Sequence, residues 1–326
     1  MNVSIGVLSI AEDKKTKLKE KGFLNVQDVL SSDAAVKHLL RDVEENELKE
    51  LKEKPHIQSA LELWKDEVSK RPIITFCSQL DTLLGGGIEL EAITDFCGAP
   101  GTGKTQICHQ LCIDVQLPEH LGGVNGQAIF IDTNYSFSYQ RLKDMAEACM
   151  LHCQWMQKEC RVRGTLPGVT DFLSGVHVSV LPEGSLSELL ATLTNLNEAL
   201  QSLPKVKLLI IDSFSKPFLL YSEDLQKRTA LIFETLILLQ NLAWKFKLAV
   251  VTTSQLTTML KPDNEATVVP GLGQGFAHQI THRVLLGHLH KSAEPRRAAQ
   301  MLKSPSRPNS SAFFKISNAG VRDEGV

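Results

Sequence analysis

One glycine-rich run in the sequence has residue types and a spacing that suit phosphate chemistry. The pattern G-x-x-x-x-G-K-[ST] is matched by Gly98, Ala99, Pro100, Gly101, Thr102, Gly103, Lys104 and Thr105. In such a loop the glycines let backbone N–H groups wrap a phosphate, the lysine holds the β- and γ-phosphates, and the threonine hydroxyl ligates Mg²⁺. The run lies between a strand-like segment, residues 93–96, and a helical segment, residues 106–115. This context favours a nucleotide site over a glycine-rich turn that matches by chance.

A magnesium ion at such a loop also needs a carboxylate, and Asp212 is the candidate. It closes the apolar run at residues 208–211, 108 residues after Lys104. In P-loop proteins an acid at the end of a buried strand holds the metal, partly through its water shell. The alternative is an ordinary turn that ends a strand. The phosphate loop earlier in the chain favours the metal role.

Length and composition set limits on what surrounds this site. The chain has 326 residues and a hydrophobic content of 43%, enough for one large domain or for a main domain with a small companion. Its 35 basic and 37 acidic residues give a formal charge of −2. Any affinity for nucleic acid must therefore come from local patches.

The cysteines and the apolar runs indicate the compartment. Seven cysteines, an odd number without a C-x-x-C pair, do not fit a disulfide framework or a zinc site, so we expect buried thiols in a reducing environment. No run of about 18 apolar residues could span a bilayer. We expect an intracellular protein without a membrane partner.

The pattern along the chain predicts two parts. Residues 1–71 read as a small helical N-terminal domain and linker, because Lys, Glu, Leu and Val recur at three- and four-residue spacing. From residue 72 to 326, β-rich runs alternate with helical stretches, which indicates an α/β domain with a mostly parallel central sheet covered by helices. The predicted strands are 92–96, 128–131, 176–180, 206–211, 248–252 and 283–289, with a short β-like run at 73–76; the predicted helices are 103–117, 138–160, 184–202 and 223–246.

Five segments resemble one known family. They are GAPGTGKTQICHQL, QLPEHLGGVNGQAIFIDT, LLIIDS, VVTTSQLTT and LKSPSRPNSSAFFKISNAGVRDE, and they are similar to segments of the eukaryotic RecA-type recombinases. Within that family, IITFCSQLDTLLGGGIEL and residues 302–305 are closest to the paralogues called C, which are DNA-repair mediators. The resemblance implies a RecA-type core that binds ATP and Mg²⁺. Residues 14–30 also resemble the opening of the family's small helical DNA-associated domain, whereas the acidic stretch after them does not.

The resemblance gives Asn134 a particular meaning. In RecA-type ATPases the corresponding strand ends in Asp-Thr-Glu, and that Glu activates the water that attacks the γ-phosphate. Here the sequence reads Asp132, Thr133 and Asn134, and Tyr135 replaces the glycine that usually follows. An amide can hydrogen-bond to a water but has no basic lone pair near neutral pH. We therefore expect nucleotide binding with impaired hydrolysis.

Five further residues take their roles from the resemblance alone. Gln255 resembles the glutamine that senses the γ-phosphate, and Arg141 the arginine that stacks on adenine. His278 resembles the histidine that reaches toward a neighbouring protomer's γ-phosphate. Pro308 resembles the proline of the adenine cap, and Lys303 stands where the strand-exchange enzyme has an acid. A place in a surface loop is the alternative for each.

The two segments that correspond to DNA-binding loops are poor in basic residues. Residues 216–226 and 257–275 carry two lysines, Lys216 and Lys261, against four acids, Glu223, Asp224, Asp263 and Glu265. Because phosphate contacts dominate affinity for nucleic acid, we expect weak binding of single-stranded or branched DNA by the isolated chain.

Three functions stay open at this point. The resemblance favours an ATP-binding mediator of homologous recombination that works in the nucleus with other recombinase paralogues and the main recombinase. The second possibility is an active DNA-dependent ATPase that forms filaments, which would need a glutamate at position 134 and basic loops. The third is a scaffold that needs no nucleotide. The complete phosphate loop counts against this function, because a scaffold would not need it.

Overall fold

The computed structural model describes Thr16, Lys19, Glu20, Gly22 and residues 58–161, 164–221, 224–260, 266–289 and 296–324. The chain divides into two units, Met1–Ser69 and Lys70–Val326. In the first unit α5 (Ala60–Ser69) has no buried side chain. Most of residues 1–71, including all but four residues of the stretch 14–30, lies outside the described residues, so the helical N-terminal domain and its boundary stay predictions.

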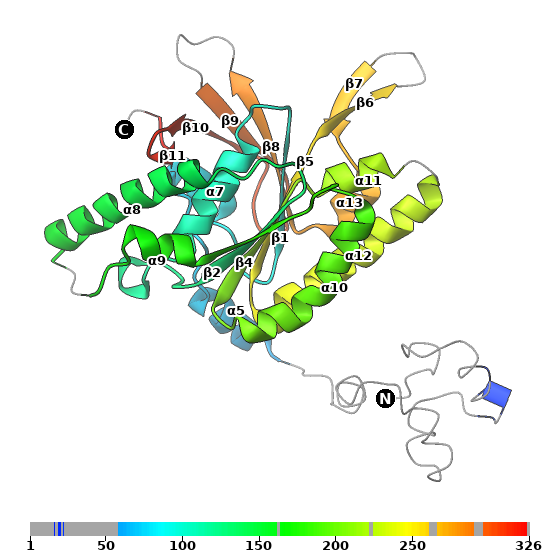
Figure 1. The fold of residues 1–326 in the computed structure, drawn as a ribbon, viewed down its shortest axis with the longest axis horizontal. Helices are drawn as coiled ribbons and strands as arrows, with labels where there is room; N and C mark the ends of the chain where they lie inside the picture. Colours follow the sequence, from blue (N-terminus) through cyan, green and yellow to red (C-terminus); the bar gives the residue numbers. More distant parts are fainter. Residues whose placement is uncertain are drawn as a thin grey trace. The chain divides into compact units, whose positions relative to one another are not determined.

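A large sheet forms the centre of the second unit (Figure 1). Among the described residues it has nine strands in the order β11-β10-β9-β8-β1-β5-β4-β2-β3. Six of them run parallel: β1 (Ile93–Gly98), β2 (Gln127–Asp132), β3 (Val176–Val180), β4 (Val206–Asp212), β5 (Ala249–Ser254) and β8 (His282–Leu289). These are the six predicted strands, and the mostly parallel α/β core is confirmed. The β-like run at 73–76 contributes only a single bridge, between Ile73 and Ile88.

Helices cover both faces of this sheet, as Figure 1 shows. One face carries α6 (Ser78–Leu84), α7 (Lys104–Asp114), α8 (Tyr139–Glu159) and α9 (Val169–Ser174), with a 3₁₀ turn at Glu119–Leu121. The other face carries α10 (Leu186–Ser202), α11 (Ser215–Leu220), α12 (Leu225–Phe246) and α13 (Gly273–Gln279). The four long helices, α7, α8, α10 and α12, correspond to the predicted ones. No described helix combines the length and the apolar character that a membrane span requires.

Helix α10 illustrates why these residues form these elements. Ser185 accepts a hydrogen bond from the backbone N–H of Glu188, and the Glu188 side chain returns to the backbone N–H of Ser185, which is a capping box. The buried leucines of the helix recur at spacings of three and four residues, which gives one apolar face against the sheet; they are Leu186, Leu189, Leu193, Leu196 and Leu200.

Two antiparallel pieces were not predicted. Strands β9 (Arg296–Lys303), β10 (Ser311–Ser317) and β11 (Gly320–Arg322) extend the sheet beyond β8. A separate hairpin, β6 (Leu256–Leu260) with β7 (Ala266–Pro270), occupies much of the predicted second DNA loop. Strands β9 and β10 mix exposed and buried side chains, so they lack the continuous apolar runs that mark the central strands.

The middle of the sheet contains a buried ion pair between β1 and β8. The Arg283 Nε lies 3.1 Å from the Asp95 Oδ2, and the two side chains are 5% and 0% exposed. The hydroxyls of Thr252 and Ser254 on β5 also donate to the Asp95 carboxylate, at 3.1 and 2.8 Å. Burial raises the pKa of Asp95, and the charge of Arg283 opposes that rise. Arg283 also donates to the Gly271 carbonyl, directly after β7.

We expect the substitution Arg283→Met to reduce the free energy of unfolding by about 3–5 kcal/mol, because it leaves Asp95 buried without its counter-charge. The pKa of Asp95 is then raised further above its ordinary value of about 3.9. Between the pKa of Asp95 in the unfolded chain and its raised pKa in the folded variant, folding takes up a proton. The free energy of unfolding of the variant therefore falls as the pH rises through this interval. Urea unfolding should show a larger loss, relative to the wild type, at about pH 8 than at about pH 5.

The double variant Asp95→Asn/Arg283→Met is the control. It removes the buried charge together with its partner, so it should recover stability and lose the added pH dependence. An Arg283→Met loss that is equal at the two pH values would contradict a buried, raised carboxyl.

Candidate functional site

The glycine-rich loop joins the end of β1 to the start of α7, and its glycines have no substitute. Gly101 and Gly103 have φ angles of 79° and 106°, which side chains with a Cβ rarely adopt. A Cβ on Gly98 would lie 2.6 Å from the carbonyl oxygen of Leu286 on β8. The loop therefore curls closely over the sheet and leads directly into the first turn of α7.

The cation of the loop is held above its own backbone. Lys104 Nζ donates to the carbonyl oxygens of Gly98 at 2.7 Å and Ala99 at 2.9 Å. Burial lowers the pKa of Lys104, and the carboxylate of Asp212 opposes that change. A phosphate in the loop would offer the ammonium stronger, charged acceptors than these carbonyls.

The two predicted magnesium ligands are in direct contact. Thr105 Oγ1 donates to Asp212 Oδ2 at 2.6 Å, and Thr253 Oγ1 on β5 donates to Asp212 Oδ1 at 2.5 Å. Ser136 Oγ lies 3.3 Å from the same Oδ2. Hard oxygen ligands of this kind suit Mg²⁺. In the described part of the chain no three His, Cys, Asp or Glu side chains form a metal cluster, so a magnesium ion here would take further ligands from phosphate and water.

Asn134 lies in a turn that Asp132 organises. The Asp132 carboxylate accepts backbone hydrogen bonds from Asn134 at 2.9 Å, Ser136 at 3.2 Å and Phe137 at 2.8 Å. Tyr135, where the family has glycine, has a φ of 54°, so its backbone keeps the left-handed conformation that glycine favours. Its hydroxyl donates to the Pro182 carbonyl at 2.7 Å. The turn thus keeps a glycine-like backbone with different side chains.

A second cation reinforces this turn. Lys216, which begins the first predicted DNA loop, donates from Nζ to the Thr133 carbonyl at 2.6 Å. The residue lies in α11, so part of the predicted loop is helical. The ammonium of Lys216 therefore serves the turn that carries Asn134.

A cavity of about 430 Å³ unites most of the predicted site. Its lining residues are Pro100, Gly101, Gly103, Lys104, Thr105, Gln106, Asn134, Asp212, Ser213, Gln255, Arg297 and Ile316. Sequence reasoning missed Gln106, Ser213, Arg297 and Ile316. The first two adjoin predicted residues, whereas Arg297 and Ile316 come from the unpredicted strands β9 and β10.

Gln255 connects this cavity to the β6–β7 hairpin. It lies between β5 and β6, and its carbonyl accepts a hydrogen bond from the Gly271 N–H at 2.8 Å. Its own N–H donates to Ser215 Oγ at 3.1 Å. One residue therefore lines the cavity and closes the base of the hairpin.

The remaining residues from the resemblance do not line the cavity. Arg141 on α8 donates to Gln106 Oε1 at 2.7 Å and to the carbonyls of Ser317 and Asn318, both at 2.6 Å. Its guanidinium thus ties α7 to the turn between β10 and β11. Stacking of Arg141 on adenine stays a prediction.

Lys303 ends β9, His278 lies on α13, and Pro308 lies between β9 and β10. Lys303 Nζ donates to the carbonyls of Ala277, His278 and Ile280 at 2.7–2.9 Å, which caps the C-terminal end of α13. His278 and Pro308 are exposed. All three of the lysine's hydrogens are used within the chain, so its predicted contact with nucleotide would require these bonds to break.

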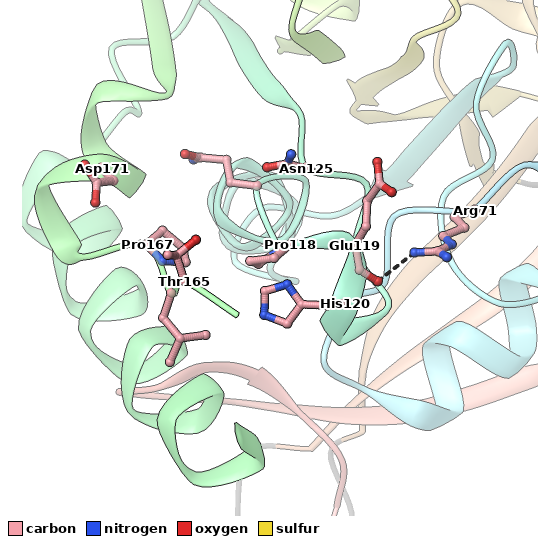
Figure 2. Close-up of a pocket in the computed structure, with 10 residues that line it drawn as sticks. Arg71, Pro118, Glu119, His120, Asn125, Thr165, Pro167 and Asp171 are labelled. Carbon is pink, nitrogen blue, oxygen red and sulfur yellow. Dashed lines mark hydrogen bonds between the residues drawn. The ribbon is translucent and has the colours of Figure 1, made fainter. Parts of the chain in front are cut away.

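A larger cavity, of about 910 Å³, contains none of the predicted site residues (Figure 2). Figure 2 shows Arg71 donating to the Glu119 carbonyl, at 2.7 Å. Gln116 donates to the carbonyls of Cys112 and Phe172, and Asp171 accepts from the Gly168 N–H. These polar groups stabilise the loops around the cavity and form no reactive pair.

Comparison with known proteins now identifies the family. The model of the Rad51 family matches residues 69–162 and 185–324. The chain belongs to the Rad51 family. It is 40% identical over 273 residues to "DNA repair protein RAD51 homolog 3" of Cricetulus griseus, which covers 82% of this chain and 73% of that protein. The protein with the same name in Dictyostelium discoideum is 35% identical over 256 residues, covering 78% of this chain and 66% of the relative.

A protein named RadA is also similar. "DNA repair and recombination protein RadA" of Metallosphaera sedula is 34% identical over 272 residues, which covers 82% of this chain and 76% of the relative. The two relatives named homolog 3 match the resemblance to paralogue C, so that prediction is confirmed. The roles of individual site residues rest on the contacts described above.

We expect the substitution Asp212→Asn to leave the fold intact and to weaken the contribution of Mg²⁺ to nucleotide affinity by about 10- to 100-fold, the usual cost of losing a carboxylate around a metal. Asp114→Asn is the matched control. Asp114 is as buried as Asp212, but it lies at the C-terminal end of α7, away from the phosphate loop that precedes the helix. Titration of both variants with ATP, with and without Mg²⁺, measures the effect. Equal magnesium dependence in the two variants would contradict the metal role.

Proposed function

We propose that this Rad51-family chain binds Mg·ATP and acts in homologous-recombination DNA repair as a mediator within a complex of recombinase paralogues. One observation carries the proposal: Lys104, Thr105 and Asp212 line one cavity together with Asn134, and Thr105 donates a hydrogen bond to Asp212. The first three suit the binding of Mg·ATP, whereas the amide of Asn134 stands where the resemblance places the general base. The names of the relatives, two RAD51 homologs and a RadA, support the repair role.

The chain's own groups divide the work of the site. The loop glycines and the N-terminus of α7 bind phosphate, and Lys104 supplies a positive charge. Thr105 and Asp212 would hold Mg²⁺, which neutralises charge on the β- and γ-phosphates when bound. The Asn134 amide can orient a water in the cavity but cannot accept its proton. Binding without rapid turnover is the outcome that this set of groups favours.

The contacts of Gln255 support a link from nucleotide to partners and DNA. Because Gln255 lines the cavity and its carbonyl bonds to Gly271, a shift of this residue on nucleotide binding would move both ends of the β6–β7 hairpin. The proposed partners are other recombinase paralogues and the main recombinase, in the nucleus. Bound ATP would then serve assembly with these partners, in place of repeated hydrolysis.

The two alternative functions have less support. An active filament-forming ATPase would need a base at position 134, where this chain has an amide, and the carboxylate of Asp132 in the same turn already accepts three backbone hydrogen bonds. A scaffold without nucleotide would not need the glycines at 98, 101 and 103, two of which have left-handed backbones.

We expect Asn134→Glu to raise the rate of ATP hydrolysis, because a positioned general base contributes about 10²–10⁴-fold to such a reaction. Phosphate release by the purified variant and by the wild type measures the gain. The double variant Lys104→Ala/Asn134→Glu is the control and should be inactive if turnover occurs at this loop. A wild-type rate equal to that of Asn134→Glu would contradict impaired hydrolysis.

We also expect the isolated chain to bind single-stranded DNA weakly. Lys216 is already bonded to Thr133, so the first predicted loop offers little free positive charge. The logarithm of the affinity should fall with the logarithm of salt concentration with a slope shallower than about −2, because each neutralised phosphate of a single strand contributes about −0.7. Fluorescence anisotropy at several salt concentrations measures the slope.

The same titration with partner paralogues present should show tighter binding and a steeper slope, since the partners supply further cationic loops. Tight binding by the chain alone with a slope of about −4 or steeper would reveal a basic surface outside these loops and contradict the expectation.

A further inference from the structure

Three neighbouring strands form a roof over the phosphate loop, defined here as β8, β9 and β10. In their antiparallel register Arg297 on β9 lies opposite both His288 on β8 and Phe314 on β10. Residues that lie directly opposite each other point to the same face of a sheet. Phe314 is buried in the core cluster that includes α7, so Arg297 faces the α7 side of the sheet.

The roof touches the loop at its glycines. A Cβ on Gly103 would lie 2.6 Å from Ile316 Cδ1, 3.5 Å from Arg297 Cδ and 3.7 Å from Arg297 Nε. A Cβ on Gly101 would lie 3.5 Å from His288 Nε2. Gly103 directly precedes Lys104, the first residue of α7. The Arg297 side chain therefore reaches the N-terminus of the helix that binds phosphate.

The order of the strands indicates which phosphates of a nucleotide Arg297 can contact. The loop leaves β1, and β8 and β9 lie on one side of β1, whereas β5, β4 and β2 lie on the other. Gln255 follows β5, Asp212 ends β4 and Asn134 lies just after β2. These three residues are the ones that the proposed function places near the γ-phosphate, its Mg²⁺ and its water. Arg297 thus lines the same cavity from the opposite flank.

We propose that Arg297 binds the α- and β-phosphates of the nucleotide, as a cation that the chain supplies to its own site. The inference rests on the proposed function, since it requires that a nucleotide occupies the loop. Arginine suits the task because its planar guanidinium presents several N–H donors that match two phosphate oxygens at once. The helix N-terminus across from it favours the same anion.

This assignment makes the diphosphate, which ADP and ATP share, the part of the nucleotide that Arg297 recognises. The diphosphate lies between α7 and Arg297 whatever is attached at the γ-position, so ADP and ATP share the contact. Nucleotide binding then depends on the roof strands as well as on the loop motif. Arg296, the preceding residue, points to the other face of β9 and pairs with Glu324 at 3.3 Å.

Calorimetric titration of the magnesium complexes of ATP and ADP tests the proposal. Arg297→Ala should lower the affinity for both nucleotides by about 10- to 100-fold, the range for hydrogen bonds to a charged group. Arg297→Lys, which keeps the charge without the fork, should lie between this variant and the wild type. Arg296→Ala is the matched control and should bind as the wild type does, because its side chain lies on the opposite face.

The outcomes separate this inference from the proposed function. Wild-type binding that Lys104→Ala abolishes and Arg297→Ala leaves unchanged would overturn the role of Arg297 alone. A loss for ATP without a loss for ADP would assign Arg297 to the γ-phosphate and also overturn it. A wild-type chain that binds neither nucleotide would overturn the proposed function itself. Thermal unfolding of each variant shows whether the fold is kept, and Arg297→Lys carries the test if Arg297→Ala unfolds.

Discussion

The carboxylate of Asp212 is the group on which the rest of the site depends. It lies at the end of β4, is 2% exposed, and accepts hydrogen bonds from Thr105 on α7 and Thr253 on β5, with Ser136 of the turn after β2 close by. An ionised carboxylate can only accept hydrogen bonds, so each neighbour must be a donor. Three hydroxyl side chains meet this requirement, and they fix the helix, the central strand and the turn relative to one another.

The turn after β2 shows how a family site can keep its shape while its chemistry changes. Asp132 holds three backbone N–H groups, and Lys216 holds the carbonyl of Thr133, so the path of the chain is set by residues outside positions 134 and 135. Tyr135 accepts a left-handed backbone, which costs a residue with a Cβ on the order of 1–3 kcal/mol. Its hydroxyl bond to Pro182 offsets part of that cost.

Local patterns predicted the centre of the molecule well. The loop from Gly98 to Thr105, the strand that ends in Asp212 and the long helices all carry their signals within a few consecutive residues. Two strands of the roof, β9 and β10, could not be predicted this way. Strand β9 reads RRAAQMLK, without the apolar run of a buried strand, and Arg297 meets the loop across 193 positions of sequence from Lys104. Such a contact exists only through the order of strands in the sheet, which no local pattern encodes.

The ion pair of Asp95 and Arg283 has a consequence for how this sequence can change over generations. Arg283 bonds to Asp95 on the strand that leads into the phosphate loop and to Gly271 at the foot of the hairpin, so a single side chain joins two regions. Replacing either charged residue alone leaves its partner buried without a counter-charge, which destabilises the fold. A substitution at one of the two positions is therefore unfavourable as long as the other residue is kept. Homologous chains should change these two positions together or leave both alone, and this restraint extends to the foot of the hairpin through the bond from Arg283 to Gly271.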